Sequence, residues 1–273
     1  MISNEALKDF AKQIRVETLK CLRHRGFGHV GGSMSVVEVL AVLYGGVMKY
    51  DPANPKKEDR DYLIMSKGHA GPAVFATLAL KGFFPLEWLN TMCEPRTLLP
   101  SHCDRLRTPG IDVSTGSLGQ GLSIAAGLAK AFKIKKQNNW VYTILGDGEL
   151  GEGQNWEAAQ FAAHYRLDNM VAFVDWNKRQ VDGYLENIMG VGDIAKKFEA
   201  FGWYALAVNG KDVAAIAEGI EKAKAEQAGK PIAIILDGVK GSGVPEYEEM
   251  FDNHFFTLDI AQADKIIADL EGN

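Results

Sequence analysis

Two apolar segments, VYTILGDG at residues 141–148 and MVAFVDWN at residues 170–177, decide the fold of this chain. A stretch from Glu152 to Tyr165 lies between them and carries apolar residues at helical spacing. A strand–helix–strand unit of this kind is nearly always a right-handed parallel crossover, so both strands end at the same edge of one sheet. Ligands of open α/β sheets bind at that edge. The residues that follow each strand are therefore the first candidates for a functional site.

Asp147 and Asn177 stand at the ends of these two strands. Because the strand ends adjoin, we expect the two side chains to lie close together. Carboxylate and carboxamide oxygens are hard ligands that Mg²⁺ and Ca²⁺ accept, and Mg²⁺ commonly shares its coordination shell with phosphates. The pair therefore predicts a metal–diphosphate site.

A dinucleotide site is the rival interpretation of the same turn. Residues 146–151 (GDGELG) fit the spacing G-x-G-x-x-G between a strand and a helix, and Asp175 lies where a ribose-binding acid would be expected. However, Asp147, Glu149 and Glu152 crowd this turn and would repel a pyrophosphate that no cation bridges. This charge favours the metal–diphosphate site. A nicotinamide-dependent oxidoreductase remains an alternative that rests on the glycine spacing alone.

Apolar periodicity and turn residues predict alternating strands and helices, and hence an α/β fold with a mainly parallel sheet covered by helices on both faces. Neither a repeat nor a linker divides the sequence, so residues 1–273 are expected to form a single domain. Ser33 is the expected N-cap of a buried helix over residues 36–47. The other expected helices cover residues 5–24, 70–81, 119–136, 213–228 and 258–270, the other strands cover residues 62–65, 203–208 and 231–236, and loops cover residues 84–117 and 241–253.

The composition, with 47% hydrophobic and 24% charged residues, is that of a globular protein with a full core. A formal net charge of −5 gives no reason to expect a nucleic acid or an anionic membrane as partner. No apolar run approaches the roughly 20 residues that span a bilayer, and no signal peptide is expected at the N-terminus. Three cysteines without metal-ligand spacing fit a reducing compartment, so a cytoplasmic location is expected. Cys103, beside His102, is expected to be a structural thiol rather than a nucleophile.

The GDG turn at residues 146–148, followed by Asn177, resembles the thiamine-diphosphate motif, and three further segments resemble those of transketolases. These segments are GHVGGS at residues 28–33, SKGHAG at residues 66–71 and STGSLGQG at residues 114–121. The resemblance runs in order over residues 10–256 and implies the thiamine-diphosphate-binding fold. It covers the diphosphate-binding domain of a transketolase and leaves out the pyrimidine-binding and C-terminal domains.

The resemblance also implies a cofactor site. The metal ion, Mg²⁺ with Ca²⁺ or Mn²⁺ as substitutes, would be held by Asp147, Asn177 and the backbone carbonyl of Arg179. Gly148 would let the backbone approach the diphosphate, which a Cβ would obstruct. The other implied contacts are His69 and His254 to the diphosphate, Gly116 and Leu118 to the aminopyrimidine, Val181 between the two cofactor rings and Glu152 at the subunit contact. For Val181, an ordinary core position is the open alternative.

Three histidines are implied in catalysis by the same resemblance. A transketolase moves a two-carbon glycolaldehyde unit from a ketose to an aldose, and the accompanying proton transfers near neutral pH suit histidine. His29 and His254 would serve the hydroxyl on the donor carbon beyond the broken bond, and His102 would contact the hydroxyls of the two-carbon unit. His24 and His164 fall in expected helices and are interpreted as structural.

The glutamate that activates the cofactor in this family belongs to the absent pyrimidine-binding domain. The resemblance therefore implies the N-terminal subunit of a split transketolase, inactive alone and paired with a C-terminal subunit in an α₂β₂ assembly. A non-catalytic thiamine-diphosphate-binding subunit is a second alternative. Val30, Ser117 and the segment SHCD at residues 101–104 depart from the usual pattern. The sugar stays open between a phosphosugar, a sulfosugar and another anionic ketose.

Overall fold

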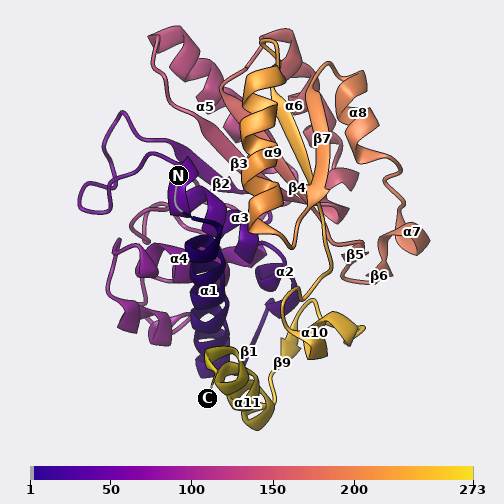
Figure 1. Cartoon of the computed structure of the whole chain (residues 1–273). Coiled ribbons are helices and arrows are strands. Elements are labelled where there is room, and N and C mark those ends of the chain that lie inside the picture. The colour runs from indigo at the N-terminus through magenta and orange to yellow at the C-terminus, as the bar shows by residue number, and fades with distance from the viewer. Residues whose placement is uncertain (1–2, 273) are drawn as a thin grey trace.

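The computed structural model of the protein describes residues 3–272. A five-stranded sheet in the order β2-β3-β4-β8-β7 forms its centre, and every neighbouring pair of strands is parallel (Figure 1). The strands are β2 (Tyr62–Met65), β3 (Val141–Gly146), β4 (Met170–Trp176), β7 (Tyr204–Asn209) and β8 (Ile232–Asp237). The predicted fold class, an α/β fold built on a parallel sheet, is confirmed.

Helices cover both faces of this sheet and form two hydrophobic clusters with it. The first cluster contains α1 (Asn4–Arg25), α2 (Val30–Met34), α3 (Val37–Val42), α4 (Gly71–Leu80), α9 (Val213–Glu226) and α11 (Ile260–Glu271). The second contains α5 (Gln120–Lys135), α6 (Gly153–His164) and α8 (Ile194–Ala200). Side chains of β3 alternate between the two, with Tyr142 and Ile144 in the first and Val141 and Leu145 in the second. Burial on both faces explains why the strands appear in the sequence as unbroken apolar runs.

The direction in which the chain crosses the sheet determines the face that each connecting helix covers. The step from β3 to β4 and the step from β7 to β8 run in opposite directions along the strand order. Because both crossovers are expected to be right-handed, their helices must lie on opposite faces. The structure agrees, since α6 belongs to the second cluster and α9 to the first.

Short elements complete the chain. They are the 3₁₀ turns η2 (Gly68–Ala70), η3 (Leu86–Thr91) and η4 (Gly148–Gly151), the π-helical turn η1 (Leu43–Val47), the short helices α7 (Leu185–Ile188) and α10 (Pro245–Glu249), and the paired strands β1 (Phe27–Gly28) with β9 (Phe256–Thr257) and β5 (Arg179–Gln180) with β6 (Gly183–Tyr184). The expectation of a loop over residues 241–253 is wrong in part, because α10 lies within it. Residues 84–117 contain η3 and are otherwise irregular, as expected.

The expected N-cap at Ser33 is wrong. The chain is already helical at Val30, so Ser33 lies inside α2 and its hydroxyl donates to the carbonyl of His29 at 2.7 Å. The expected helix over residues 36–47 is divided into α3 and η1, and Val36 occupies the N-cap position of α3.

The expectation that no apolar run approaches bilayer length is also corrected. The stretch Val30–Val47 is 18 residues long and, by length and composition alone, apolar enough to cross a membrane. It is divided among α2, α3 and η1, and 89% of it is buried inside the structure. Its apolar side chains therefore form part of the first hydrophobic cluster.

Two glycines of α5 offer a matched test of this packing. A Cβ at Gly121 would lie 2.3 Å from the hydroxyl oxygen of Ser66 and 2.7 Å from its Cα, whereas a Cβ at Gly127 would meet nothing within 4 Å. We expect Gly121→Ala to lower the free energy of unfolding by about 1–3 kcal/mol through overpacking. Gly127→Ala should raise it by roughly 0.5–1 kcal/mol through helix propensity. Urea denaturation of both variants checks this, and equal effects would contradict the packing.

Candidate functional site

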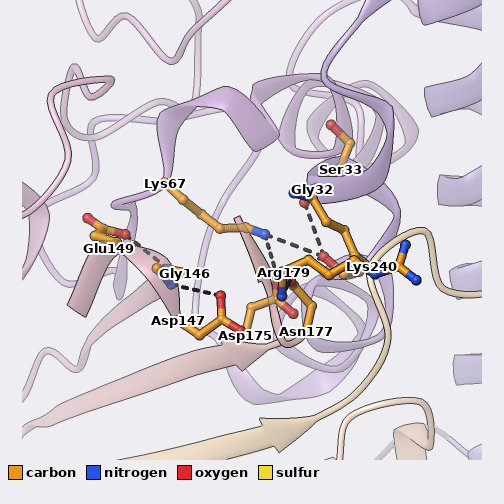
Figure 2. Close-up of polar contacts among 12 residues, drawn as sticks. Gly32, Ser33, Lys67, Gly146, Asp147, Glu149, Asp175, Asn177, Arg179 and Lys240 are labelled. Carbon is orange, nitrogen blue, oxygen red and sulfur yellow. Dashed lines mark hydrogen bonds and ion pairs between the residues drawn. The ribbon is translucent and has the colours of Figure 1, made fainter. Parts of the chain in front are cut away.

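The turns after β3 and β4 lie side by side at the carboxyl edge of the sheet. The parallel register places Gly146 opposite Asp175, and the residues that follow them are therefore neighbours. A carboxylate oxygen of Asp147 accepts a hydrogen bond from the backbone N–H of Lys178 at 2.6 Å, which ties the two turns together. Asp147 and Asn177 line the same cleft, with a volume of about 230 Å³ (Figure 2). The expected convergence of this acid and this amide is confirmed.

The remaining walls of this cleft come from segments far apart in the sequence. Its lining includes most of the residues that the sequence indicated for cofactor binding: His69, Leu118, Gly148, Glu152, Arg179, Val181 and His254. Val181 is 64% exposed, so its interpretation as an ordinary core valine is wrong. Glu152 occupies the N-cap position of α6 at the cleft wall. The roles of these residues toward a cofactor stay predictions.

Four imidazole rings form a cluster that extends the cleft. The centroid of the His29 ring lies 5.3 Å from that of His69, 5.6 Å from that of His102 and 5.3 Å from that of His254. A Cβ at Gly116 would lie 3.1 Å from the His102 ring, so this glycine packs against the same cluster. His29, His102 and Gly116 thus lie next to the cleft. Among the residues that the structure describes, they are not part of its lining.

Burial keeps these imidazoles neutral. Desolvation, with smaller contributions from neighbouring His102 and Lys240, lowers the pKa of His29 to about 4. Desolvation and the charge of Lys240 lower the pKa of His254 to about 3. The pKa values of His69 and His102 are lowered as well, chiefly by desolvation. The unprotonated nitrogen of a neutral ring can accept a hydrogen bond from a sugar hydroxyl near pH 7.

Two lysines of the cleft were not selected from the sequence. The side chain of Lys240, a buried residue, places its Nζ 2.9 Å from Nδ1 of His254, and desolvation together with the charge of Lys67 lowers its pKa to about 8. Lys67 is also buried and lines the cleft. The segment KGSG at residues 240–243 follows β8, which pairs with β4, so Lys240 could have been found by the same strand-end argument.

The charge argument against a dinucleotide site needs a correction at Glu149. This residue is buried, and its carboxylate accepts hydrogen bonds from the N–H groups of Gly119 at 2.9 Å and Gly146 at 3.0 Å and from the hydroxyl of Ser66. Glu149 therefore joins three segments of the fold and is not directed at a ligand. Both acids line the cleft, but the argument survives for Asp147, whose carboxylate accepts hydrogen bonds only from the backbone N–H groups of Gly148 and Lys178 in the two turns.

Asp175 does not behave as a ribose-binding acid. It is 1% exposed, and its Oδ2 atom lies 2.5 Å from Nζ of Lys67. Its charge is thus used inside the protein, which removes the second half of the dinucleotide fingerprint. Cys103 is buried with its pKa raised to about 12 by desolvation, so its interpretation as a structural thiol is supported.

The donors of the cleft fit a magnesium–diphosphate group. Within residues 3–272, no group of three or more His, Cys, Asp and Glu side chains could hold a metal by itself. A cation beside Asp147 and Asn177 would therefore need further oxygens from the backbone and from phosphates, as Mg²⁺ prefers. Lys240 and the neutral His69 and His254 line the same cleft and can supply N–H groups for phosphate oxygens.

Comparison with known proteins shows the family to which this chain belongs. The chain matches the family described as "Transketolase, thiamine diphosphate binding domain" over residues 6–269. It is 48% identical over 265 residues to the 6-deoxy-6-sulfo-D-fructose transketolase subunit SqwG of a Clostridium species, covering 97% of this chain and 96% of the relative. It is 38% identical to one of the apulose-4-phosphate transketolase subunits of Actinobacillus succinogenes, covering 89% of this chain and 88% of that one.

The solved structures agree with the sequence matches. The transketolase of Campylobacter jejuni superposes with a TM-score of 0.91 and 30% identity over 99% of this chain, but over only 43% of its own length. The chain belongs to the transketolase family and corresponds to its N-terminal, thiamine-diphosphate-binding part. The dinucleotide interpretation of the glycine turn is overturned by this membership.

The neutral histidines make the stability of the free protein depend on pH. Their pKa values are about 4 for His29 and about 3 for His254 in the folded chain, against about 6.5 in an unfolded one. At these two positions the unfolded chain binds more protons below about pH 6.5, so their contribution to stability is complete above this value and falls as the pH is lowered toward 4. Denaturation with urea at pH 7.5 and pH 5 measures the loss. His254→Gln should reduce it, and an unchanged loss would contradict the neutral state of this ring.

Lys240 should contribute to holding an anion in the cleft. Because hydrogen bonds to charged groups are worth about 1.5–3 kcal/mol, Lys240→Met is expected to weaken thiamine-diphosphate binding by about 10- to 100-fold. Calorimetric titration in the presence of Mg²⁺ measures this change. Lys211→Met is the matched control, because Lys211 lies outside the cleft and pairs with Glu248 at 3.0 Å. An equal effect of both variants would rule out a local role of Lys240.

Proposed function

We propose that this protein is the diphosphate-binding subunit of a Mg²⁺- and thiamine-diphosphate-dependent transketolase that transfers a glycolaldehyde unit from an anionic ketose to an aldose. The observation that carries the proposal is the meeting of Asp147 and Asn177 in one cleft that continues into a cluster of neutral histidines. The first arrangement suits a metal–diphosphate group and the second suits proton transfer to and from a sugar.

Each part of the cleft has a distinct task in this reaction. Asp147, Asn177 and the carbonyl of Arg179 hold the cation, while Lys240 and His69 donate to the diphosphate. Thiamine diphosphate, when bound, supplies the nucleophilic carbon that carries the two-carbon unit between sugars. His29 and His254 exchange the proton of the donor hydroxyl, and His102 orients the hydroxyls of the two-carbon unit. Since desolvation keeps these rings neutral, they present unprotonated nitrogens that can accept hydrogen bonds from sugar hydroxyls near pH 7.

A second chain completes the proposed active site. This chain covers 42% of the human transketolase but 96% and 88% of two relatives that are named as transketolase subunits. We therefore assign the activating glutamate and the residues that bind the other end of the cofactor to a C-terminal partner. Leu118 and Val181, exposed side chains at the cleft, are proposed to face this partner and the cofactor rings. An α₂β₂ assembly in the cytoplasm, in which each copy of this chain is a single domain, is the arrangement we propose.

The proposed donor is a ketose with a terminal anion. The relative with 48% identity is named for 6-deoxy-6-sulfo-D-fructose, and the relative with 38% identity for apulose 4-phosphate. The higher identity over nearly the whole of both chains favours the sulfonated ketose as the first donor to assay. Fructose 6-phosphate, which has a phosphate in place of the sulfonate, is the matched comparison.

Calorimetry with the chain and its C-terminal partner tests the cofactor. We expect thiamine diphosphate to bind only when Mg²⁺ is present and NAD not to bind. Asp147→Ala should abolish measurable binding, because the cation loses its charged ligand. Each of the two chains by itself should fail to produce a new sugar from a ketose and an aldose, and the mixture should succeed. Binding without turnover in the mixture would identify a non-catalytic binding subunit.

A further inference from the structure

Asp175 is a buried acid that the proposed reaction does not use. Its Oδ2 atom lies 2.5 Å from Nζ of Lys67, 2.7 Å from the hydroxyl of Ser35 and 2.8 Å from Nδ2 of Asn177. Lys67 and Asp175 are each 1% exposed, and Figure 2 shows the Lys67 side chain extending toward Asp175 and Asn177. One carboxylate oxygen thus joins the end of β4 to two other segments.

This contact allows the carboxamide of Asn177 only one orientation. Its Nδ2 donates to Asp175, and its Oδ1 accepts from the N–H of Arg179 at 3.1 Å. Rotating the amide by half a turn would set Oδ1 against a carboxylate oxygen and Nδ2 against an N–H donor. Both hydrogen bonds would then be lost, because an acceptor would face an acceptor and a donor would face a donor. The carboxylate of Asp175 therefore decides which atom of Asn177 is available as an oxygen ligand.

The surroundings hold Asp175 itself in place. A buried carboxylate is costly unless it is paired and hydrogen-bonded. Lys67, just after β2, supplies the opposite charge, and Ser35, at the end of α2, supplies a hydroxyl. Since the donors arrive from separate segments, the oxygen atom they surround is fixed in position. Groups that orient a metal ligand in this way commonly change metal affinity by about 10- to 100-fold when removed.

We propose that Asp175 is a positioning residue for the cation site: it fixes the amide of Asn177 with its oxygen toward the cation, and Lys67 and Ser35 hold Asp175 in that role. This inference rests on the proposed function, because it assumes a cation at Asp147 and Asn177. Asp175 acts through Asn177 and has no contact of its own with the cation.

A double-mutant cycle on the complex of this chain with its partner tests the inference. The Mg²⁺ concentration that gives half-maximal thiamine-diphosphate binding is measured by calorimetry for the wild type, Asp175→Asn, Asn177→Ala and the double variant. We expect Asp175→Asn to raise this concentration about 10- to 100-fold. In the Asn177→Ala background it should have no further effect, because a residue that acts through another has nothing left to position.

Two results would overturn the inference. Either Asp175→Asn leaves the Mg²⁺ requirement unchanged, or its full effect persists in the Asn177→Ala background, as expected for a direct ligand or a general structural role. If Asp175→Asn alone does not fold, because Lys67 is left as an unpaired buried charge, Lys67→Met/Asp175→Asn replaces it in both arms of the cycle. The effect of losing the lysine charge then occurs in both arms and cancels from the coupling.

Arg60 and Asp112 provide a matched control. They form another ion pair, at 2.6 Å with side chains 12% and 6% exposed, which lies outside the cleft. Arg60→Met/Asp112→Asn should lower thermal stability and leave the Mg²⁺ requirement unchanged, and a change in both would assign the effect at Asp175 to loosened packing. A wild-type complex that binds no thiamine diphosphate with Mg²⁺ would contradict the proposed function itself, which separates that failure from a failure of the positioning role.

Discussion

β3 and β4 pair in parallel from Val141 opposite Met170 to Gly146 opposite Asp175, and this register governs everything built at the edge of the sheet. A parallel pair brings two carboxyl ends together, so one crossover is enough to juxtapose Asp147 and Asn177. Slipping the register by one residue would turn every side chain of β4 to the other face of the sheet. The two hydrophobic clusters, each of which takes alternate residues from these strands, prevent such a slip.

The charged side chains at this edge of the sheet fall into two groups. Some form contacts within the protein, and others remain available to a ligand. Glu149 and Asp175 are surrounded by donors from other segments and join the turns of the sheet to one another. Asp147 and Lys240 keep positions on the cleft wall. The same edge therefore contains an internal scaffold of buried ionic contacts and, above it, the groups that suit a cation and a diphosphate.

The sequence was sufficient to predict the parallel sheet and the pair Asp147 and Asn177, because apolar runs and the crossover rule act locally. The histidines were selected through the family resemblance. His29 and His69 fall in its glycine-rich segments, whereas His102 and His254 fall in loops. The strand end before Lys240 was a usable signal, but the pairing of β8 with β4 is a tertiary property that local patterns do not contain. The inward orientation of the Glu149 side chain could not be predicted for the same reason, because its partners Ser66 and Gly119 come from other parts of the chain. At Ser33, local capping preference gave way to a helix that starts at Val30.

The cleft draws on residues from Gly32 to His254, and these are delivered by many different elements. Pairings such as β2 with β3 and β4 with β8 join segments distant in the chain, and contacts of this kind are slow to form in folding. A partly folded chain therefore lacks an assembled cleft in which a ligand could bind. Any molecule that enters the cleft binds the native state and not the unfolded one, so it protects the whole chain against unfolding to a degree that rises with its free concentration. The free concentration of the cofactor would therefore also influence how much folded protein is available to associate with the partner subunit.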